Sequence, residues 1–412
     1  MMGYLELDLT ISDEVKAMYE TVKKFAMEVM RPAGIELDKL VDPADVITPG
    51  SKMWDVIKTY RELGLHKAGV PKAFGGLAED MDPKVGPLIA QEMGYGDAGL
   101  TICLGVSAFP ITFAAMSPEP ELQQLVRDYC GDTEGKIIGC WAITEPDHGS
   151  DWIMSTLPSF DDPRCAPQVK AVLKGDEYII NGQKSAWVSN GTIATHAALH
   201  VSLDPSKGMQ GTGLAVVPLD LPGITRGKPL DKIGQRPLNQ GEIFFEEVKL
   251  PKKYMIITDG AIMSAVAKMI LTSANGGMGL SFVGLAQAAY DEALKYAKER
   301  IQGGVPIFEH KNIKLQLFEM FIKVEAARGF ARRMAAYNAA MAPNGSALHA
   351  VAAKVLSTRT AFEVASEAIQ VFGGNGLSKE YIIEKLFRDA KAAMIEDGEN
   401  NALSIAAADD LI

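Results

Sequence analysis

Side chains that could take part in catalysis gather near the C-terminal end of the chain. A glycine-rich stretch, Gln370 to Gly376, separates two helical patterns and could bring backbone N–H groups close to a phosphate. Further along, Arg388 and Asp389 precede Ile395-Glu-Asp-Gly398, an acidic pair before a glycine that could place a carboxylate in a pocket. Glycines between helices are usually a plain turn and acidic pairs are usually solvated, so the argument depends on the order and spacing of these pieces.

Other stretches combine aromatic, hydroxyl or basic side chains with glycine. Trp141 to Asp151 reads Trp-Ala-Ile-Thr-Glu-Pro-Asp-His-Gly-Ser-Asp, a strand pattern that runs into a polar loop. Asn181 to Gly191 reads Asn-Gly-Gln-Lys-Ser-Ala-Trp-Val-Ser-Asn-Gly, with an aromatic residue in a hairpin pattern that would usually serve the core. Arg300 to Lys311 begins with Arg-Ile-Gln-Gly-Gly, and its arginine offers a fork of donors that suits phosphate.

Together these stretches resemble the acyl-CoA dehydrogenase family over most of the chain. In that family a carboxylate takes the α-proton of an acyl-CoA while a hydride passes to FAD, and the resemblance implies the same activity and cofactor here. The matching base is Asp397, where most members have Glu, and the family's following Thr is Glu399. Glu396 is a competing candidate for the base. Asp is shorter than Glu by about 1.5 Å, so the backbone or the substrate must come closer.

The resemblance implies a set of FAD contacts, with Arg300 reaching the pyrophosphate of a neighbouring subunit. Ser150 also matches a contact to the CoA arm, and Gly398 and Asn275 match substrate-binding positions. Asn275 stands where members commonly carry Arg, which indicates either a reshaped acyl pocket or a change in helix packing. Gly303 replaces a Phe that packs on FAD, which puts the local packing in question. The residues matched to FAD contacts are Trp141, Ile143, Thr144, Gly149, Ser150, Trp187, Val188, Ser189, Arg300, Gln302, Lys311, Gln370, Gly373, Gly374 and Glu399.

Asp97 is a second candidate catalytic acid. It lies in Glu92-Met-Gly-Tyr-Gly-Asp-Ala-Gly-Leu100, a helix-end segment that lines the acyl pocket in the family, where a capping role is the simpler interpretation. In a sharper hypothesis Asp97 removes a proton further round a ring, so that a cyclic 2-enoyl-CoA becomes a conjugated diene. That hypothesis follows the similarity to members acting on cyclohexane- or cyclohex-1-ene-1-carboxyl-CoA. His148, where the family usually has Ala, could titrate near neutral pH.

Alternative functions stay open at this point. One alternative within the same family is a dehydrogenase that acts on linear short- or medium-chain acyl-CoAs. A flavin oxidase of the nitroalkane-oxidase type also uses an Asp base, and an acyl-CoA lyase or desulfinase on the same fold would use flavin only structurally. A non-enzymatic CoA- or flavin-binding protein is kept open by Glu399, Gly303 and Asn275.

Composition narrows the choice of partners. The chain has 412 residues and a formal net charge of −11, which argues against nucleic-acid binding. No basic run or signal-peptide pattern is evident, and the uncharged residues 269–290 contain enough polar and glycine residues to predict a buried bundle helix rather than a membrane span.

Four cysteines without Cys-x-x-Cys spacing and six scattered histidines predict reduced thiols, a cytoplasmic protein and no metal site. The resemblance adds an electron-transferring flavoprotein as electron acceptor and a homotetramer as assembly.

Hydrophobic periodicity predicts an α+β multi-domain fold in three parts. Residues 1–135 are expected to form an all-helical domain, 136–255 a β-barrel or sandwich, and 256–412 a four-helix bundle, which is also the family's order. Ser12 is expected to cap a first helix that Pro32 ends. Further predicted helices are 51–63, 82–95, 118–130, 260–300, 308–341, 345–370 and 379–395. Predicted strands are 137–143, 177–184 running into an Asn181-Gly182 turn, 185–189, 195–203, 213–219 and 241–249.

Overall fold

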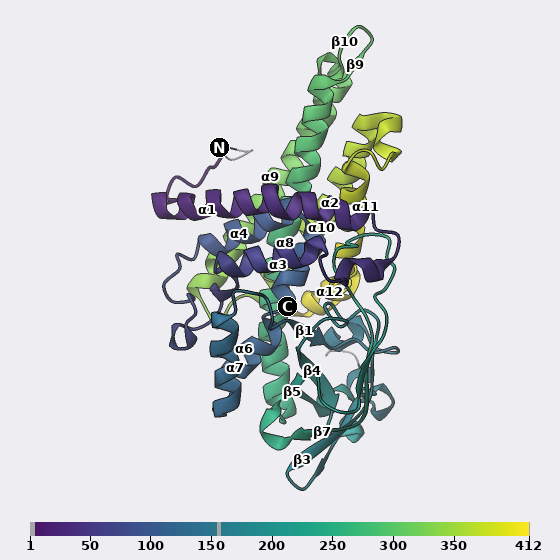
Figure 1. Cartoon of the computed structure of the whole chain (residues 1–412). Coiled ribbons are helices and arrows are strands. Elements are labelled where there is room, and N and C mark those ends of the chain that lie inside the picture. The colour runs from purple at the N-terminus through teal and green to yellow at the C-terminus, as the bar shows by residue number, and fades with distance from the viewer. Residues whose placement is uncertain (1–4, 155–157, 412) are drawn as a thin grey trace.

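Helices from both ends of the chain pack beside a sheet contributed by its middle. The structure is a computed structural model that describes residues 5–154 and 158–411. In Figure 1 the purple and blue N-terminal helices cross the green and yellow C-terminal helices, and the teal strands lie below them. The chain therefore has the predicted order of a helical part, a sheet and a second helical part, and the predicted fold class is confirmed.

The N-terminal part is helical, and its first helix begins where the sequence predicts. The hydroxyl oxygen of Ser12 accepts a hydrogen bond from the N–H of Val15 at 3.2 Å. The prediction that Pro32 ends this helix is wrong, because a π-helical turn, Ala26–Met30, leads directly into α2, where Pro32 occupies the first turn. A widened turn gives the proline ring room where a regular helix would clash. The α-helices are α1 (Asp13–Phe25), α2 (Arg31–Asp38), α3 (Lys52–Glu62), α4 (Val85–Gly96), α5 (Ala98–Val106), α6 (Phe109–Met116) and α7 (Pro120–Gly131).

The middle part is a mixed sheet of eight strands in the order β6-β7-β3-β2-β4-β5-β8, with β1 paired to β4. The β1–β4 pairing is parallel and brings Trp141 opposite Ala198. Strand β4 is buried along most of its length, so the sheet carries its own apolar core. The strands are β1 (Gly139–Ala142), β2 (Lys170–Lys174), β3 (Glu177–Lys184), β4 (His196–Ser202), β5 (Thr212–Pro218), β6 (Ile224–Arg226), β7 (Ile243–Pro251) and β8 (Met255–Ile257).

Two sequence predictions within this sheet are wrong. Asn181-Gly182 is not a turn but lies inside β3, at a bulge against β7. A Cβ on Gly182 would come within 2.7 Å of the Cα of Val169, so close packing explains this glycine. The tight turn lies instead between β2 and β3, at Gly175, whose φ is 64°. The predicted strand at 185–189 is also absent, because β3 ends at Lys184 and the chain then turns.

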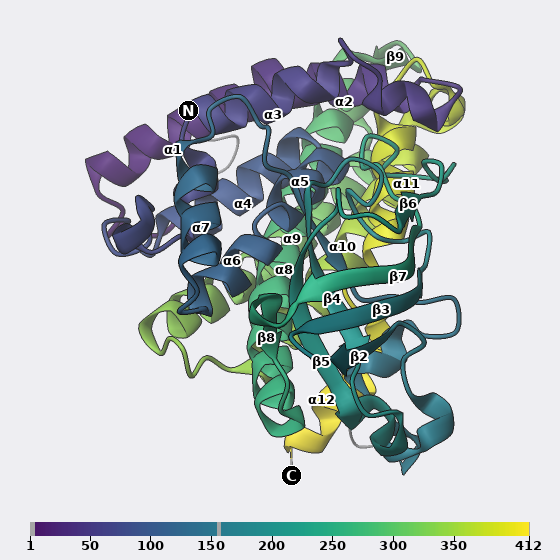
Figure 2. The same cartoon turned by 60° about the horizontal axis from the view of Figure 1, so that its bottom comes forward.

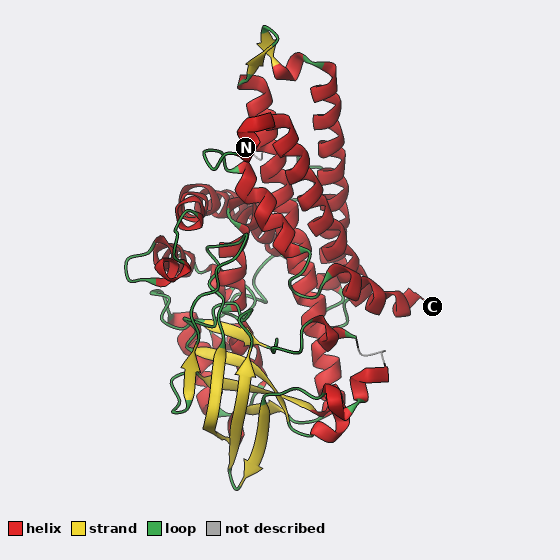
Figure 3. Cartoon of the chain, turned by 90° about the vertical axis from the view of Figure 1, so that its right-hand side faces the viewer, coloured by secondary structure: helices red, strands yellow, loops and turns green. Residues whose placement is uncertain are grey.

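The C-terminal part is a helical bundle with α8 at its centre. Helix α8 is rich in Ala and Gly and packs against α4, α9 and α10. A Cβ on Gly284 of α8 would lie 1.9 Å from the carbonyl oxygen of Gln91 in α4, so these two helices meet backbone to backbone. Figure 3 shows the short strands β9 and β10 at the far tip of the bundle. The elements are α8 (Gly260–Glu299), β9 (Ile301–Gln302), β10 (Val305–Pro306), α9 (Lys311–Ala340), α10 (Ala347–Phe372), α11 (Ile383–Ala393) and α12 (Asn400–Ala408).

Two helical stretches are long and apolar enough to cross a membrane by length and composition alone. They are Ala98–Met116 and Gly260–Glu299, and 56% and 67% of their most apolar windows are buried inside the protein. The prediction that residues 269–290 form a helix buried in the bundle is confirmed. Figure 2 shows this helix, α8, passing along the sheet beside β5 and β8.

Candidate active site

A cavity of about 580 Å³ lies where the three parts of the chain meet. Its wall combines the end of β1, the loop at 149–153, the 187–189 turn, the 231–235 loop, α5, the first turns of α8 and the turn after α11. Most of the wall is apolar or aromatic, and a few polar groups interrupt it. This is the composition expected of a site for a cofactor and a small substrate.

The predicted base lies in the turn between α11 and α12, and this turn opens onto the cavity. Asp397 has a φ of 51° and Gly398 a φ of 94°, so both residues adopt the left-handed conformation. Glu396, Asp397 and Gly398 all line the cavity. Burial raises the pKa of Asp397, and the nearby cation of Lys354 opposes that rise. We refer below to residues 396–399 as the base turn.

Lys354 supports the base turn from α10, and the sequence analysis missed it. Its side chain is fully buried, and Nζ donates to the carbonyl oxygen of Gly398 at 2.7 Å and to Oδ1 of Asn400 at 2.9 Å. Burial lowers the pKa of Lys354 to about 8, against the raising effect of Asp397. A charged residue on the apolar face of the 345–370 helical pattern was the available signal, because a lysine is rarely buried without a partner.

Glu399, which stands where the family has Thr, acts as the N-cap of α12. Its carboxylate accepts the N–H of Asn401 at 2.9 Å and of Ala402 at 3.0 Å. Burial acts to raise its pKa, but these two backbone hydrogen bonds hold the pKa below its usual range. The N–H of Glu399 donates to Oγ of Ser150 at 2.9 Å, which ties the base turn to the loop after β1. Glu399 does not line the cavity, so its predicted FAD contact is not formed within one chain.

The predicted residues of the Trp141–Asp151 stretch line the cavity. Trp141, Ile143, Thr144, Gly149 and Ser150 all belong to its wall. The indole N–H of Trp141 donates to Nε2 of His200 at 2.9 Å, and its ring stacks on Phe109 with centroids 4.8 Å apart. These contacts hold the ring at the end of β1.

Polar residues of the same stretch that lie off the cavity act within the loop. His148, considered as a titrating group, is buried and pairs through Nδ1 with Oδ2 of Asp151 at 2.6 Å. Glu145 is buried and pairs with the equally buried Lys184 at 2.7 Å. Neither His148 nor Glu145 lines the cavity, so both side chains position the loop.

Trp187 and Ser189 also line the cavity, whereas Val188 does not. Trp187 is 57% exposed although it belongs to the cavity wall. The amide of Gln240 donates to Oγ of Ser189 at 3.1 Å and to the carbonyl oxygen of Trp187 at 3.2 Å, which fixes the turn. The side chain of Val188 is buried in the core of the sheet and does not reach the cavity.

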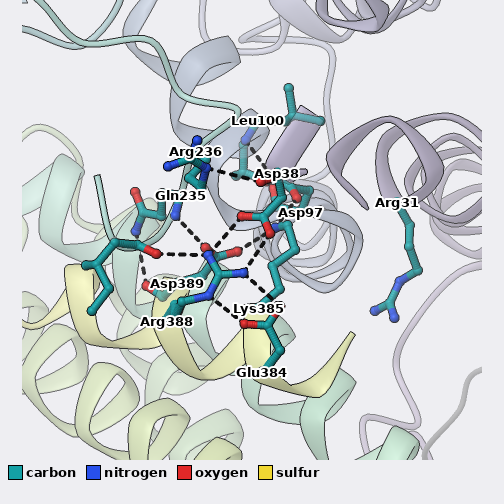
Figure 4. Close-up of polar contacts among 12 residues, drawn as sticks. Arg31, Asp38, Asp97, Leu100, Gln235, Arg236, Glu384, Lys385, Arg388 and Asp389 are labelled. Atoms are coloured by element: carbon teal, nitrogen blue, oxygen red, sulfur yellow. Dashed lines mark hydrogen bonds and ion pairs between the residues drawn. The ribbon is translucent and has the colours of Figure 1, made fainter. Parts of the chain in front are cut away.

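Asp97 and Asn275 lie outside the cavity wall. Asp97 is the N-cap of α5, where Oδ1 accepts the N–H of Leu100 at 2.8 Å, and its Oδ2 pairs with the buried Nζ of Lys385 at 2.6 Å (Figure 4). The structure therefore assigns Asp97 the capping role and gives no geometry for the second-acid hypothesis. The side chain of Asn275 is fully buried and donates to the carbonyl oxygen of Leu271, so it packs within α8.

The remaining predicted FAD contacts lie at the far tip of the bundle. They are exposed, and none of them lines the cavity of their own chain. The ends of α8 and α10 meet there, since the ring of Tyr296 stacks on Phe372 with centroids 4.0 Å apart and its hydroxyl accepts from Asn375 at 2.9 Å. A contact with a neighbouring subunit's cofactor, as predicted, requires this exposure. The residues are Arg300, Gln302, Lys311, Gln370, Gly373 and Gly374.

The cavity fits the flavin that the sequence resemblance implies. The side chain of Trp187 is more than half exposed and belongs to the cavity wall, so its indole can offer stacking area to a flat aromatic ring. Among the residues that the structure describes, Nε1 of Trp152 and Nδ1 of His200 are buried without a hydrogen-bond partner, and both side chains line the cavity. Buried polar atoms are normally satisfied, so these two indicate a ligand with polar groups. Trp141, Thr144, Trp187 and Ser189 would hold the flavin.

Comparison with known proteins agrees with this geometry. The chain matches the N-terminal, middle and C-terminal domain models of acyl-CoA dehydrogenases at residues 12–117, 140–248 and 264–411. It is 29% identical to cyclohex-1-ene-1-carbonyl-CoA dehydrogenase of Syntrophus aciditrophicus, over 95% of this chain and 88% of that one, and 29% identical to the protein of the same name in Geobacter metallireducens, over 95% and 96%. Butyryl-CoA dehydrogenase from Megasphaera elsdenii superposes with a TM-score of 0.85 at 26% identity, over 98% of this chain and 100% of that one. The chain therefore belongs to the acyl-CoA dehydrogenase family of FAD-dependent oxidoreductases.

Proposed function

We propose that this acyl-CoA dehydrogenase oxidises an alicyclic acyl-CoA, of the cyclohexane- or cyclohex-1-ene-1-carboxyl-CoA class, with Asp397 as the base. The observation that carries the proposal is the position of Asp397 in the cavity wall, in a turn that Lys354 and Ser150 hold in place. A base one C–C bond shorter than Glu, by about 1.5 Å, suits a ring that brings its proton closer. Two relatives carry the name of a cyclohexene-carbonyl-CoA dehydrogenase.

The protein's part in this reaction is to bind, to orient and to move one proton. From a cyclohexane-1-carbonyl-CoA the α-proton passes to the carboxylate of Asp397. A cyclohex-1-ene-1-carbonyl-CoA has no α-hydrogen, so there the proton passes to Asp397 from an allylic ring carbon, and the negative charge still reaches the thioester oxygen through the conjugated double bond. Among the described residues no acceptor takes the backbone N–H of Asp397, so this N–H is available to the thioester carbonyl oxygen, where negative charge develops. FAD, when bound, supplies the two-electron acceptor for the hydride that leaves the β-carbon. Trp187 and the apolar residues of α5 and α8 in the cavity wall limit the access of water.

The partner and assembly are part of the same proposal. The exposed tip that carries Arg300 and Lys311 supports a homotetramer in which a neighbouring subunit's FAD lies against it. Exposed apolar side chains follow one stripe of α9 at Leu315, Phe318 and Ile322, which a second helix could cover. An electron-transferring flavoprotein remains the proposed electron acceptor. The cysteines are free thiols, which supports a cytoplasmic location.

The experiment that tests the proposal is the visible spectrum of the purified protein without oxygen, before and after addition of acyl-CoAs. Bleaching of the flavin band by cyclohexane- or cyclohex-1-ene-1-carbonyl-CoA, but not by butyryl- or octanoyl-CoA, supports it. Bleaching by the linear thioesters alone refutes the alicyclic substrate. Turnover that consumes oxygen without another acceptor would favour an oxidase, and turnover without bleaching would favour a lyase.

A further inference from the structure

A second carboxyl shares the wall of the active-site cavity with the base. Glu396 precedes Asp397 in the base turn and lines the same cavity. The side-chain amide of Gln235 donates to Oε1 of Glu396 at 2.5 Å, and Gln235 is the hydrogen-bond partner of Glu396 among the described residues. No described residue hydrogen-bonds Oε2, the other carboxyl oxygen, so it is available to a group bound in the cavity. Lys232 lines the cavity beside it and donates to the carbonyl oxygen of Leu238 at 2.7 Å.

A chain of buried groups fixes the position of Gln235. Its backbone N–H donates to the carboxylate of Asp389, and its own φ of 49° is one that non-glycine residues rarely adopt. Lys385 bridges Asp389 and Asp97 with two contacts of 2.6 Å, and Figure 4 shows these three side chains next to Gln235. All four side chains are buried. An unfavourable backbone conformation persists only where the surrounding groups hold it, so the position of Gln235 in the site is fixed.

The loop that carries Gln235 is anchored independently of this chain of groups. Arg388 donates to the carbonyl oxygen of Ile233 at 2.8 Å. The same guanidinium holds both oxygens of Asp38, at 3.0 and 2.6 Å, and both oxygens of Glu384, at 2.9 and 2.7 Å. The polar wall at 232–235 and Glu396 is thus rigid before any substrate arrives, which lowers the cost of forming a hydrogen bond to it.

We propose that Glu396 is a specificity residue that hydrogen-bonds a hydroxyl group carried by the acyl part of the substrate. The proposal rests on the dehydrogenase function above and narrows its substrate class to hydroxylated acyl-CoAs. A plain hydrocarbon acyl group placed against Glu396 would remove its free carboxyl oxygen from water and offer nothing in return, which is unfavourable. Sites built around such a group reject analogues that lack the matching hydroxyl.

The protonation of Glu396 suits this role. Burial raises its pKa to about 7, with the hydrogen bond from Gln235 opposing the rise and the charge of Asp397 adding to it. Near neutral pH the carboxyl can therefore either donate to a hydroxyl oxygen or accept from a hydroxyl hydrogen. A hydroxyl is the substituent that can satisfy both states. Asp397 keeps the proton transfer, so the two acids have separate tasks.

The test measures binding and flavin reduction with matched thioester pairs. The pairs are cyclohexane-1-carbonyl-CoA with its 3- and 4-hydroxy derivatives, and butyryl-CoA with 4-hydroxybutyryl-CoA. Affinity is measured by calorimetry on the dithionite-reduced holoenzyme, which binds these thioesters without oxidising them. The rate of flavin bleaching is measured on the oxidised holoenzyme. The wild type is expected to favour a hydroxylated member about tenfold in both measurements, which corresponds to about 1.4 kcal/mol and lies within the range for one hydrogen bond to a buried carboxyl group.

Variants decide whether Glu396 causes the preference. Glu396→Leu is expected to lose it and to bind the plain members more tightly, while Glu396→Gln, which keeps a hydrogen-bonding side chain, retains part of it. Glu62→Gln, an exposed acid at the end of α3, is the matched control and keeps the wild-type preference. The proposal is overturned if the wild type binds both members of each pair equally well. It is also overturned if Glu396→Leu keeps the wild-type preference, or if Glu396→Leu loses FAD while its preference stays unchanged. A hydroxyl preference confined to the linear pair would refute the alicyclic substrate and leave the role of Glu396 standing.

Discussion

Replacing Asp97 by Asn separates the two roles that the sequence allows for this acid. The variant keeps a side-chain oxygen for the N-cap of α5, because Asn caps helices about as well as Asp. It removes one of the two carboxylates that hold the buried ammonium of Lys385, at 2.6 Å. Breaking a buried ion pair costs about 3–5 kcal/mol when the remaining charge is left alone. Lys385 keeps Asp389, so we expect the free energy of unfolding to fall by about 2 kcal/mol.

The assay compares stability and chemistry in the same preparation. Thermal unfolding followed by circular dichroism should show a midpoint lowered by roughly 2 °C for Asp97→Asn, because a chain of 412 residues has an unfolding entropy of about 0.9 kcal/mol/K. The rate of flavin reduction for each bound FAD should stay within about twofold of the wild type, because Asp97 does not line the cavity. Asp42→Asn is the matched control: Asp42 also caps a helix, but it is exposed. An unchanged midpoint together with a loss of flavin reduction by orders of magnitude would refute this reasoning and restore the second-acid hypothesis.

Further predictions concern the base, its cation and acid stability. Asp397→Asn should retain FAD and lower the rate of flavin bleaching by about 10²–10⁴-fold, as stopped-flow absorbance would measure. Lys354→Met removes the cation that opposes the rise of the pKa of Asp397, so the acid limb of the pH–rate profile should move to higher pH; an unmoved limb would contradict this. Burial lowers the pKa of His66 from 6.5 to about 4 in the folded protein. Between pH 6.5 and pH 4 the unfolded chain therefore binds a proton at this histidine that the folded protein does not, and the free energy of unfolding falls as the pH drops through this range. In His66→Phe the urea midpoint should fall less between pH 7 and pH 5 than it does in the wild type. An equal fall in both proteins would be evidence against this role of His66.

The sequence was informative wherever a motif is continuous along the chain. Trp141, Thr144, Trp187 and Ser189 were predicted as ligand contacts and lie in the wall of one cavity, although β1 and the 187–189 turn are far apart in sequence. A strand end and a turn place their side chains through local geometry, which short patterns record. The same holds for the acid before a glycine at Asp397, since its turn uses the left-handed conformation that glycine favours next to it.

The sequence was less informative where a residue's role depends on partners far along the chain. Asp97 looks like a pocket acid until Lys385, almost three hundred positions later, is placed on it at 2.6 Å. Lys354 falls on the apolar face of its helical pattern, but only the structure shows that its partner is the base turn. Gln235 carries no motif of its own, and only the structure connects it to Glu396 and Asp389. In each case a tertiary contact decides the function, and local periodicity does not identify the partner in that contact.

The base turn explains how this chain departs from the family pattern at two neighbouring positions without losing its shape. Glu399 replaces Thr but still satisfies the first N–H groups of α12, so the cap is preserved by a longer side chain. Lys354 and Ser150 hold the turn through the backbone of Gly398 and Glu399, which does not depend on the identity of the acid. Shortening Glu to Asp at position 397 therefore reduces the reach of the predicted base by about 1.5 Å without removing any of these backbone contacts. We expect the substrate to come closer by this distance, and a rigid wall that orients the acyl group at Glu396 is one means by which it can do so.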